Sequence, residues 1–370
     1  MEILYEGVVE LFTIVGLKRV IMWLIGALLI YLAIKKDMEP TLLLPMGFGA
    51  IVVNVPGVYD GALGTLFDAG IANELFPLIL FIGIGAMIDF GPVLSNPKLM
   101  IFGAAAQFGI FFTFSLAALF FDMKEAASIG IIGAADGPTA IVVAQKLLGD
   151  KSTITGAIMV AAYSYMALVP VIQPPIIKLL TTKKERLIRM PYRPKNVSKT
   201  TRILFPIVIT VVGGLVAPES IDLLGFLMFG NLIRECGVLN SLSETAQKVL
   251  ANLVTIFLGI TVATQMTADK FLQPATLLIL GLGLFAFIFD TAGGIIVAKI
   301  INIFSKEKIN PMIGAAGISA FPMSGRVVHK MGLQEDPQNF LLMHSIGVNV
   351  SGQIASVIAG SLILGFMLNI

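Results

Sequence analysis

Long hydrophobic runs separated by short polar connections dominate this chain. A helix needs about 20 apolar residues to cross the hydrocarbon core of a bilayer. By that length, membrane spans are predicted at residues 17–34, 75–95, 99–121, 154–177, 250–267, 275–301 and 340–368. Shorter apolar segments are predicted at residues 41–55, 203–217 and 221–235. The pattern therefore predicts an all-α polytopic membrane protein.

Two further hydrophobic stretches, 126–148 and 310–330, contain too many glycine, proline and polar residues to be plain spans. Polar backbone at membrane depth is tolerated only where it is buried in protein or lines a cavity. We expect both stretches to be broken or re-entrant helices.

These two stretches occupy corresponding places in two similar halves of the chain. Residues 81–109 are similar to 257–283, and 131–149 are similar to 312–332, where IIGAA corresponds to MIGAA. A weak internal repeat with an interrupted segment in each half is typical of transporters that bind substrate and ion near the midplane. We expect two inverted repeats whose broken helices meet at a midplane site, although the span pattern does not fix their orientation.

One long polar connection, residues 178–202, divides the halves with the sequence KLLTTKKERLIRMPYRPKNVSKTTR. It holds nine Lys or Arg residues and one acid, Glu185, so the positive-inside rule predicts that it is cytoplasmic. This linker either sets orientation only or also docks an acidic or carboxylated partner. The expected organisation is an interfacial segment at 1–16, a first membrane half at 17–177, the linker, and a second half at 203–370.

Composition supports the membrane class and excludes others. The chain is 56% hydrophobic and 13% charged, whereas a soluble domain is about a quarter charged. A net charge of +2 gives no indication of nucleic-acid binding. The single cysteine, Cys236, excludes an intramolecular disulfide, and no Cys/His spacing is typical of a metal site.

The stretch IIGAADGPTAIVV, residues 131–143, places the carboxylate of Asp136 among apolar residues, directly before Gly137 and Pro138. A buried carboxylate is costly unless it is paired, neutralised or bound to a cation. An acid inside the membrane is therefore a functional candidate. We predict that Asp136 binds a small hard cation, which prefers oxygen ligands. The alternative is a structural ion pair with Arg326.

Polar residues of the second half offer further oxygen ligands, in the stretches INPMIGAAGISAFPMSGR and HSIGVNVSGQ. They include Asn310, Ser319, Asn349, Ser351 and Gln353. Small polar residues of this kind also serve helix packing, which is the alternative for Ser351 and Gln353.

Other polar residues carry weaker signals. We interpret Asp89 and Asp290, close to the predicted span ends, as structural. Tyr163 and Tyr165 are two positions apart on one predicted helix, so at most one of them points into a central site.

Four motifs resemble the membrane β subunit of the sodium-pumping, biotin-dependent decarboxylases: GAADGPTAIVV, AYSYMALVPVIQPPI, NPMIGAAGISAFPMSGRV and NFLLMHSIGVNVSGQIAS. The resemblance extends from about residue 17 to the C-terminus, with one departure, Ala134 where GGADGPT is expected. It implies that carboxybiotin on a biotin carrier protein is decarboxylated here while Na⁺ is exported across the cytoplasmic (inner) membrane of a prokaryote. It also implies a carboxyltransferase subunit, a small accessory membrane subunit and a homo-oligomer.

Members of that family act on oxaloacetate, methylmalonyl-CoA, glutaconyl-CoA or malonate. The oxaloacetate members carry a longer middle region, so the compact linker of this chain favours an acyl-CoA substrate.

The resemblance also assigns roles to residues. Asp136, Asn310 and Asn349, with Gly314 in the same motif, correspond to its sodium site. Tyr165, Arg326 and Ser319 correspond to coupling residues. Tyr165 would relay a proton to the ureido nitrogen of biotin, and Arg326 would hold the carboxylate.

Two other functions remain open from the sequence. A secondary Na⁺-coupled carboxylate transporter of similar repeat architecture is the alternative, because the absence of a GxxxxGK[ST] motif fits both. A cation channel is disfavoured, because it needs no buried coupling residues in both halves.

Overall fold

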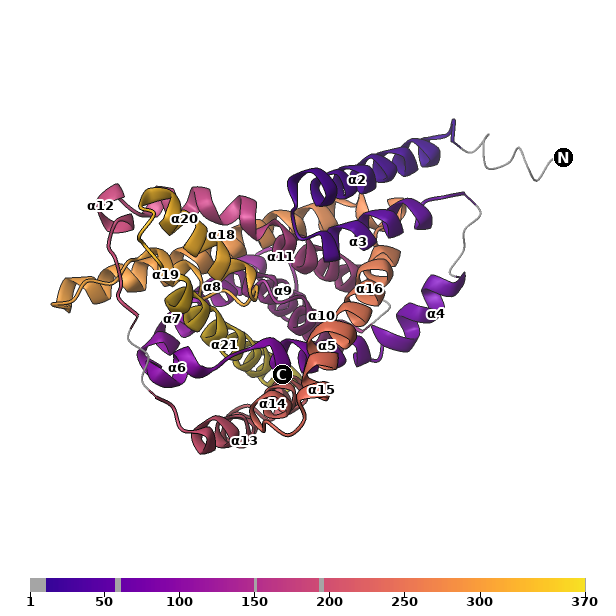
Figure 1. Cartoon of the computed structure of the whole chain (residues 1–370). Coiled ribbons are helices and arrows are strands. Elements are labelled where there is room, and N and C mark those ends of the chain that lie inside the picture. The colour runs from indigo at the N-terminus through magenta and orange to yellow at the C-terminus, as the bar shows by residue number, and fades with distance from the viewer. Residues whose placement is uncertain (1–10, 57–60, 150–151, 193–195, 370) are drawn as a thin grey trace.

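The computed structural model describes residues 11–56, 61–149, 152–192 and 196–369, and all the regular elements it describes are helices (Figure 1). Up to Arg186, within the linker, these are α2 (Ile14–Lys36), α3 (Pro40–Val53), α4 (Gly61–Gly70), α5 (Leu75–Met87), α6 (Gly91–Ser95), η1 (Pro97–Leu99), α7 (Met100–Ala106), α8 (Phe108–Ala117), α9 (Met123–Gly130), η2 (Ile131–Ala134), α10 (Gly137–Leu148), α11 (Thr153–Leu180) and α12 (Lys183–Arg186). After it come α13 (Lys199–Val216), η3 (Pro218–Ser220), α14 (Ile221–Glu235), α15 (Asn240–Glu244), η4 (Thr245–Leu250), α16 (Ala251–Val262), η5 (Ala263–Gln265), α17 (Ala268–Phe271), α18 (Pro274–Phe304), α19 (Met312–Ala315), α20 (Met323–Glu335) and α21 (Leu342–Leu368).

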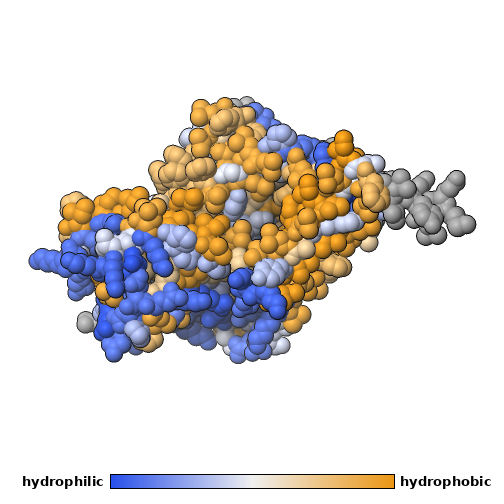
Figure 2. Space-filling view, turned by 90° about the horizontal axis from the view of Figure 1, so that it is seen from above, coloured by the Kyte–Doolittle hydropathy of each residue, from blue (hydrophilic) through white to orange (hydrophobic). Residues whose placement is uncertain are grey.

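The outer surface of the molecule suits a lipid environment. Within the described ranges, 7 helices are long and apolar enough to cross a membrane, or 8 if the bent pair α4 and α5 counts as one span. Large apolar side chains are exposed along outer helices such as α2 and α13. Figure 2 shows hydrophobic residues over much of one face, with hydrophilic residues gathered along one side. An all-α polytopic membrane protein is therefore confirmed.

Both stretches expected to be broken are interrupted. Residues 126–148 fall on α9, η2 and α10, and residues 310–330 fall on α19 and the start of α20. The predicted span at 75–95 is shorter than expected, since α5 ends at Met87 and a separate helix starts at Gly91–Pro92. Helix α4 was missed, because its sequence GALGTLFDAG is not an apolar run. It joins α5 at a bend of 65°.

Some expectations about organisation stay predictions. The helix assignments by themselves do not show two repeats or their orientation. Part of the interfacial segment expected at 1–16 lies outside the described residues, and α2 begins at Ile14.

The interrupted segments lie in the core. Helix α10 packs on α11 and α21, and η2 packs on α18. All four residues of η2 are buried, as is α10 from Gly137 to Gln145. Glycines allow the closest approaches: a Cβ on Gly314 would lie 2.1 Å from the carbonyl oxygen of Gly294 on α18. Packing through small residues is how membrane helices approach closely.

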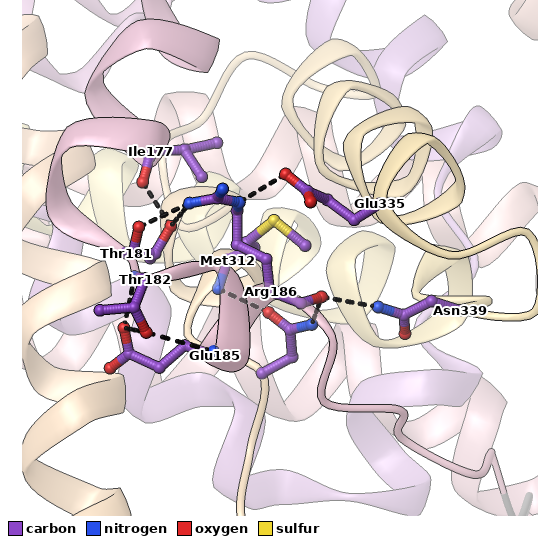
Figure 3. A network of polar contacts seen from close by, with 9 residues as sticks. Ile177, Thr181, Thr182, Glu185, Arg186, Met312, Glu335 and Asn339 are labelled. Atoms are coloured by element: carbon purple, nitrogen blue, oxygen red, sulfur yellow. Dashed lines mark hydrogen bonds and ion pairs between the residues drawn. The ribbon is translucent and has the colours of Figure 1, made fainter.

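The basic linker is docked on the second half through a polar network (Figure 3). The Nε of Arg186 donates to Glu335 at 2.6 Å, and its Nη1 donates to the carbonyl of Thr181 at 2.6 Å. The backbone carbonyl of Arg186 accepts hydrogen bonds from the side-chain amides of Asn310 and Asn339, each at 2.9 Å. The described part of the linker is therefore a docked segment rather than only a solvated connection.

Candidate functional site

Asp136 is placed at the start of a helix by a tight turn. It is the N-cap residue of α10, and Pro138 fits the first turn of a helix. The preceding residue, Ala135, has a φ of 51°, a left-handed conformation that costs about 1–2 kcal/mol for a residue with a Cβ. Tertiary contacts hold this turn, among them the amide of Ser319, which donates to the carbonyl of Ala134 at 3.0 Å. The carboxylate consequently lies at the positive end of the α10 dipole.

Three side-chain donors converge on one oxygen of Asp136. Its Oδ2 accepts from Thr139 Oγ1 at 2.7 Å, from Gln353 Nε2 at 2.9 Å and from Ser356 Oγ at 3.2 Å. The residue is 3% exposed. Because donated hydrogen bonds favour the charged form of a carboxyl group, this arrangement stabilises an ionised carboxylate.

The other oxygen, Oδ1, differs from Oδ2 in its side-chain partners. Among the residues that the structure describes, no side chain donates to it and no lysine or arginine forms an ion pair with Asp136. Arg326 is exposed on α20, so the alternative of an Asp136–Arg326 pair is not realised here.

Asn349 supplies a second uncommitted oxygen nearby on α21. Its Nδ2 donates to the carbonyl of Ile318 at 2.6 Å, whereas its Oδ1 is buried and has no hydrogen-bond partner among the described residues. Asn349 precedes Gln353 by one helical turn, about 6 Å of rise, and Gln353 contacts Asp136. A buried acceptor without a partner is costly, and amide oxygens are ligands for hard cations.

Ser319 connects the two interrupted segments. Its amide bonds to Ala134 beside Asp136, and its hydroxyl donates to the carbonyl of Gly352 on α21 at 3.1 Å. The two interrupted segments therefore meet directly, whereas the two repeats expected to contain them stay a prediction. Ser351 has a packing role by comparison, since its hydroxyl donates to Leu99 and Val348 carbonyls.

Asn310 and Gly314 lie apart from this cluster. The Asn310 amide donates to the carbonyls of Arg186 and Ile188, and its Oδ1 accepts from the Met312 amide at 3.1 Å. Gly314 is packed against α18. Their assignment to a sodium site stays a prediction.

The two tyrosines diverge, as their spacing predicted. The ring of Tyr163 lies against Gly137, next to Asp136, and its buried hydroxyl has no hydrogen-bond partner in the part of the chain that the structure describes. The Tyr165 hydroxyl donates to the carbonyl of Leu280, and its ring lies against Gly283 of α18. The tyrosine beside the carboxylate is thus Tyr163, and a proton-relay role for Tyr165 stays a prediction.

Outside the membrane spans, the charge of Arg326 acts on the turn between α2 and α3. Burial raises the pKa of Glu39, between α2 and α3, and the hydrogen bond from Thr41 and the positive charge of Arg326 oppose that rise. Elsewhere, the hydrogen bond from Arg189 lowers the pKa of Asp336 below its ordinary value. Arg326 is therefore an exposed cation facing an acidic turn.

We predicted no role for Ser356 from the sequence, and for Gln353 we left helix packing open as the alternative to cation binding. A signal was available, because Asn349, Gln353 and Ser356 recur at i, i+4 and i+7 and so share one face of α21.

The fold and the site together define a polytopic helical membrane protein with a buried, hydrogen-bonded carboxylate where two broken segments meet. The family model described as "Na+-transporting oxaloacetate decarboxylase beta subunit" matches residues 18–367. The chain is 45% identical to the oxaloacetate decarboxylase beta chain of Klebsiella pneumoniae over 420 residues, covering 95% of this chain and 96% of that one.

Similar identities relate the chain to subunits named for another substrate. It is 47% identical to the methylmalonyl-CoA decarboxylase subunit beta of Propionigenium modestum over 375 residues, covering 93% of this chain and 94% of that one. It is 48% identical to the methylmalonyl-CoA decarboxylase subunit beta of Veillonella parvula over 352 residues, covering 94% and 93%. The chain belongs to the family of beta subunits of Na⁺-transporting, biotin-dependent decarboxylases, which confirms the resemblance of its motifs.

Proposed function

We propose that this chain decarboxylates carboxybiotin held on a partner biotin carrier protein and uses the reaction to export Na⁺ across the cytoplasmic membrane. The observation that carries the proposal is the Asp136 carboxylate, which three side chains hold through Oδ2, leaving Oδ1 without a side-chain donor among the described residues. In a family of Na⁺-transporting decarboxylases, that Oδ1 is a sodium ligand, with Asn349 Oδ1 as a second.

The chemistry consumes one proton and provides the driving force. Loss of CO₂ breaks the N–C bond of the carboxylated ureido group, and the electron pair stays on nitrogen, which then takes a proton. Moving one Na⁺ outward against about 100 mV costs about 2.3 kcal/mol, so pumping requires a driving reaction of this kind. Arg326 has the planar fork that suits a carboxylate, and its exposure leaves it accessible to a group presented by a partner.

The proposed function also implies other subunits. The relatives are named as beta chains or subunits, so a multi-subunit complex is expected. We assign a carboxyltransferase subunit, a biotin carrier and a small accessory membrane subunit to that complex, with this chain as a homo-oligomer in the inner membrane. The docked basic linker is on the cytoplasmic side, where the carrier approaches.

An acyl-CoA is the favoured source of the carboxyl group. The alignment with the oxaloacetate relative is longer than this chain, so that relative carries insertions, whereas the alignments with the two methylmalonyl-CoA relatives are close to the chain's own length or shorter. The compact linker is consistent with this preference.

The test begins with the gently solubilised complex. Avidin blotting and mass spectrometry should find a biotinylated carrier and a carboxyltransferase co-purifying with this chain. A chain that purifies without any biotinylated partner, yet drives Na⁺-dependent uptake of a carboxylate, would instead establish the secondary transporter.

A further inference from the structure

A second carboxylate lies inside the membrane region, at Asp290 in the middle of α18. It is 1% exposed, and neither of its oxygens has a hydrogen-bond partner of good geometry. It also forms no ion pair with any residue in the described ranges. The interpretation of Asp290 as a structural residue near a span end therefore leaves its burial unexplained.

The Asp290 carboxyl packs directly on backbone. A Cβ on Gly109 would lie 2.1 Å from its Oδ1, and a Cβ on Gly133 would lie 3.0 Å from its Oδ2. The backbone amides of Gly109 and Ile110 approach the carboxyl, but the Ile110 amide already donates to the Gln107 carbonyl at 3.1 Å. The carboxyl is therefore packed on backbone, without a hydrogen bond of good geometry from the described residues.

No charged side chain on the helices packed against α18 is paired with the Asp290 carboxyl. Of the elements packed on α18, the segments α7, α8, η2 and α19 contain no acidic, basic or histidine residue. The titratable residues on the others, α9, α11 and α17, are Lys124, Glu125, Tyr163, Tyr165, Lys178, Asp269 and Lys270. None of these is paired with Asp290, so an ionised form would be a lone charge in an apolar medium, which is very costly.

We propose that Asp290 is a proton-binding residue of the pump, neutral in this conformation and exchanging its proton during the transport cycle. The two buried acids have opposite surroundings, since Asp136 receives three hydrogen bonds and Asp290 receives none of good geometry. Two carboxyl groups with such different surroundings are expected to have different acid–base roles. The exchange releases H⁺ from the carboxyl oxygen, leaves the electron pair there, and regains H⁺ from water.

The segment η2 links the two acids. Asp290 packs on Gly133, and Asp136 follows three residues later in the chain. A movement of η2 would therefore change the surroundings of both acids. This coupling rests on the proposed function, whereas the protonation of Asp290 does not.

Asp290→Asn is the direct test, because it keeps the shape of the neutral acid and cannot release a proton. We expect the complex to assemble and bind Na⁺ normally, while decarboxylation falls roughly 10²-fold, the scale of a lost proton-transfer group, and loses the wild-type pH profile. Asp290→Glu should restore part of the activity. The matched control is Asp89→Asn, at a partly exposed acid near Arg202, which should behave as wild type.

Infrared difference spectroscopy gives a readout without turnover. The wild type should show the C=O stretch of a protonated carboxyl, absent in Asp290→Asn and shifted in Asp290→Glu. Should the Asn variant misassemble, the Glu variant still decides through this shift. Wild-type turnover and pH profile in Asp290→Asn, or no protonated carboxyl assignable to Asp290, overturns the proposal. If the wild type assembles with a carboxylated carrier and does not turn over, the proposed function fails, and the infrared result still stands.

Discussion

Replacing Asp136 by Asn removes one charge and leaves the shape of the site almost unchanged. The carbonyl oxygen of Asn can take the place of Oδ2 and accept the same three hydrogen bonds from Thr139, Gln353 and Ser356. The NH₂ group would then occupy the position of Oδ1. The variant should therefore insert, fold and assemble like the wild type.

The loss in Na⁺ binding follows from the missing charge. Two unit charges about 4 Å apart interact with about 4 kcal/mol at an effective dielectric constant near 20. Each 1.4 kcal/mol is a factor of ten, so the affinity for Na⁺ should fall roughly 10³-fold. The NH₂ group facing the ion would weaken binding further.

The assay is the Na⁺ dependence of decarboxylation by the reconstituted complex, together with equilibrium binding of radioactive sodium. Asp89→Asn is the matched control, since it removes an acid at the protein surface. Ser356→Ala is an intermediate case that removes one donor and keeps the charge. Full Na⁺ stimulation by a correctly assembled Asp136→Asn complex, at the wild-type sodium concentration, would refute the assignment of Asp136.

Arg326→Lys keeps the charge but not the bidentate fork, so decarboxylation at saturating Na⁺ should stay far below wild type; near-normal activity would remove Arg326 from carboxylate binding. Gly314→Ala places a Cβ 2.1 Å from a backbone oxygen of α18 and should destabilise the protein by about 1–3 kcal/mol, seen as a lower Tm in detergent, whereas Gly281→Ala, with open space around it, should not. An unchanged Tm for Gly314→Ala would argue against tight α18–α19 packing. A cysteine at Lys184, in a Cys236→Ser background, should react with an impermeant maleimide in inverted vesicles only, and labelling in intact cells would place the linker outside.

The membrane helices were predictable because bilayer thickness fixes their length. The predicted span at 275–301 corresponds to α18, and 340–368 corresponds to α21. Asp136 was also predictable, since a carboxylate in an apolar run next to Gly-Pro has few structural explanations. The hydrogen-bond partners of Asp136 on α21 were harder to predict, because 217 residues separate Gln353 from Asp136. Only the packing of α10 on α21 brings them together.

Polar residues with more than one possible use were the least predictable. Asn310 was predicted to bind Na⁺, but in this structure its amide holds the backbone of the linker. The linker charges were predicted to be solvated or to dock a partner, but Arg186 is paired with Glu335 at 2.6 Å. Tyr165 and Tyr163 could be told apart only once the direction of α11 was known. Asp290 was interpreted as structural, although it lies near the middle of the predicted span at 275–301 and of α18 alike.

The central claim is that this chain decarboxylates carboxybiotin in a reaction that requires Na⁺ at Asp136. The most direct measurement is release of labelled CO₂ from a preformed, carboxylated biotin carrier by the purified protein in proteoliposomes. We expect release that depends on Na⁺, is accompanied by Na⁺ movement, and is lost in Asp136→Asn. No release by the wild type, with the carrier present and shown to be carboxylated, would contradict it.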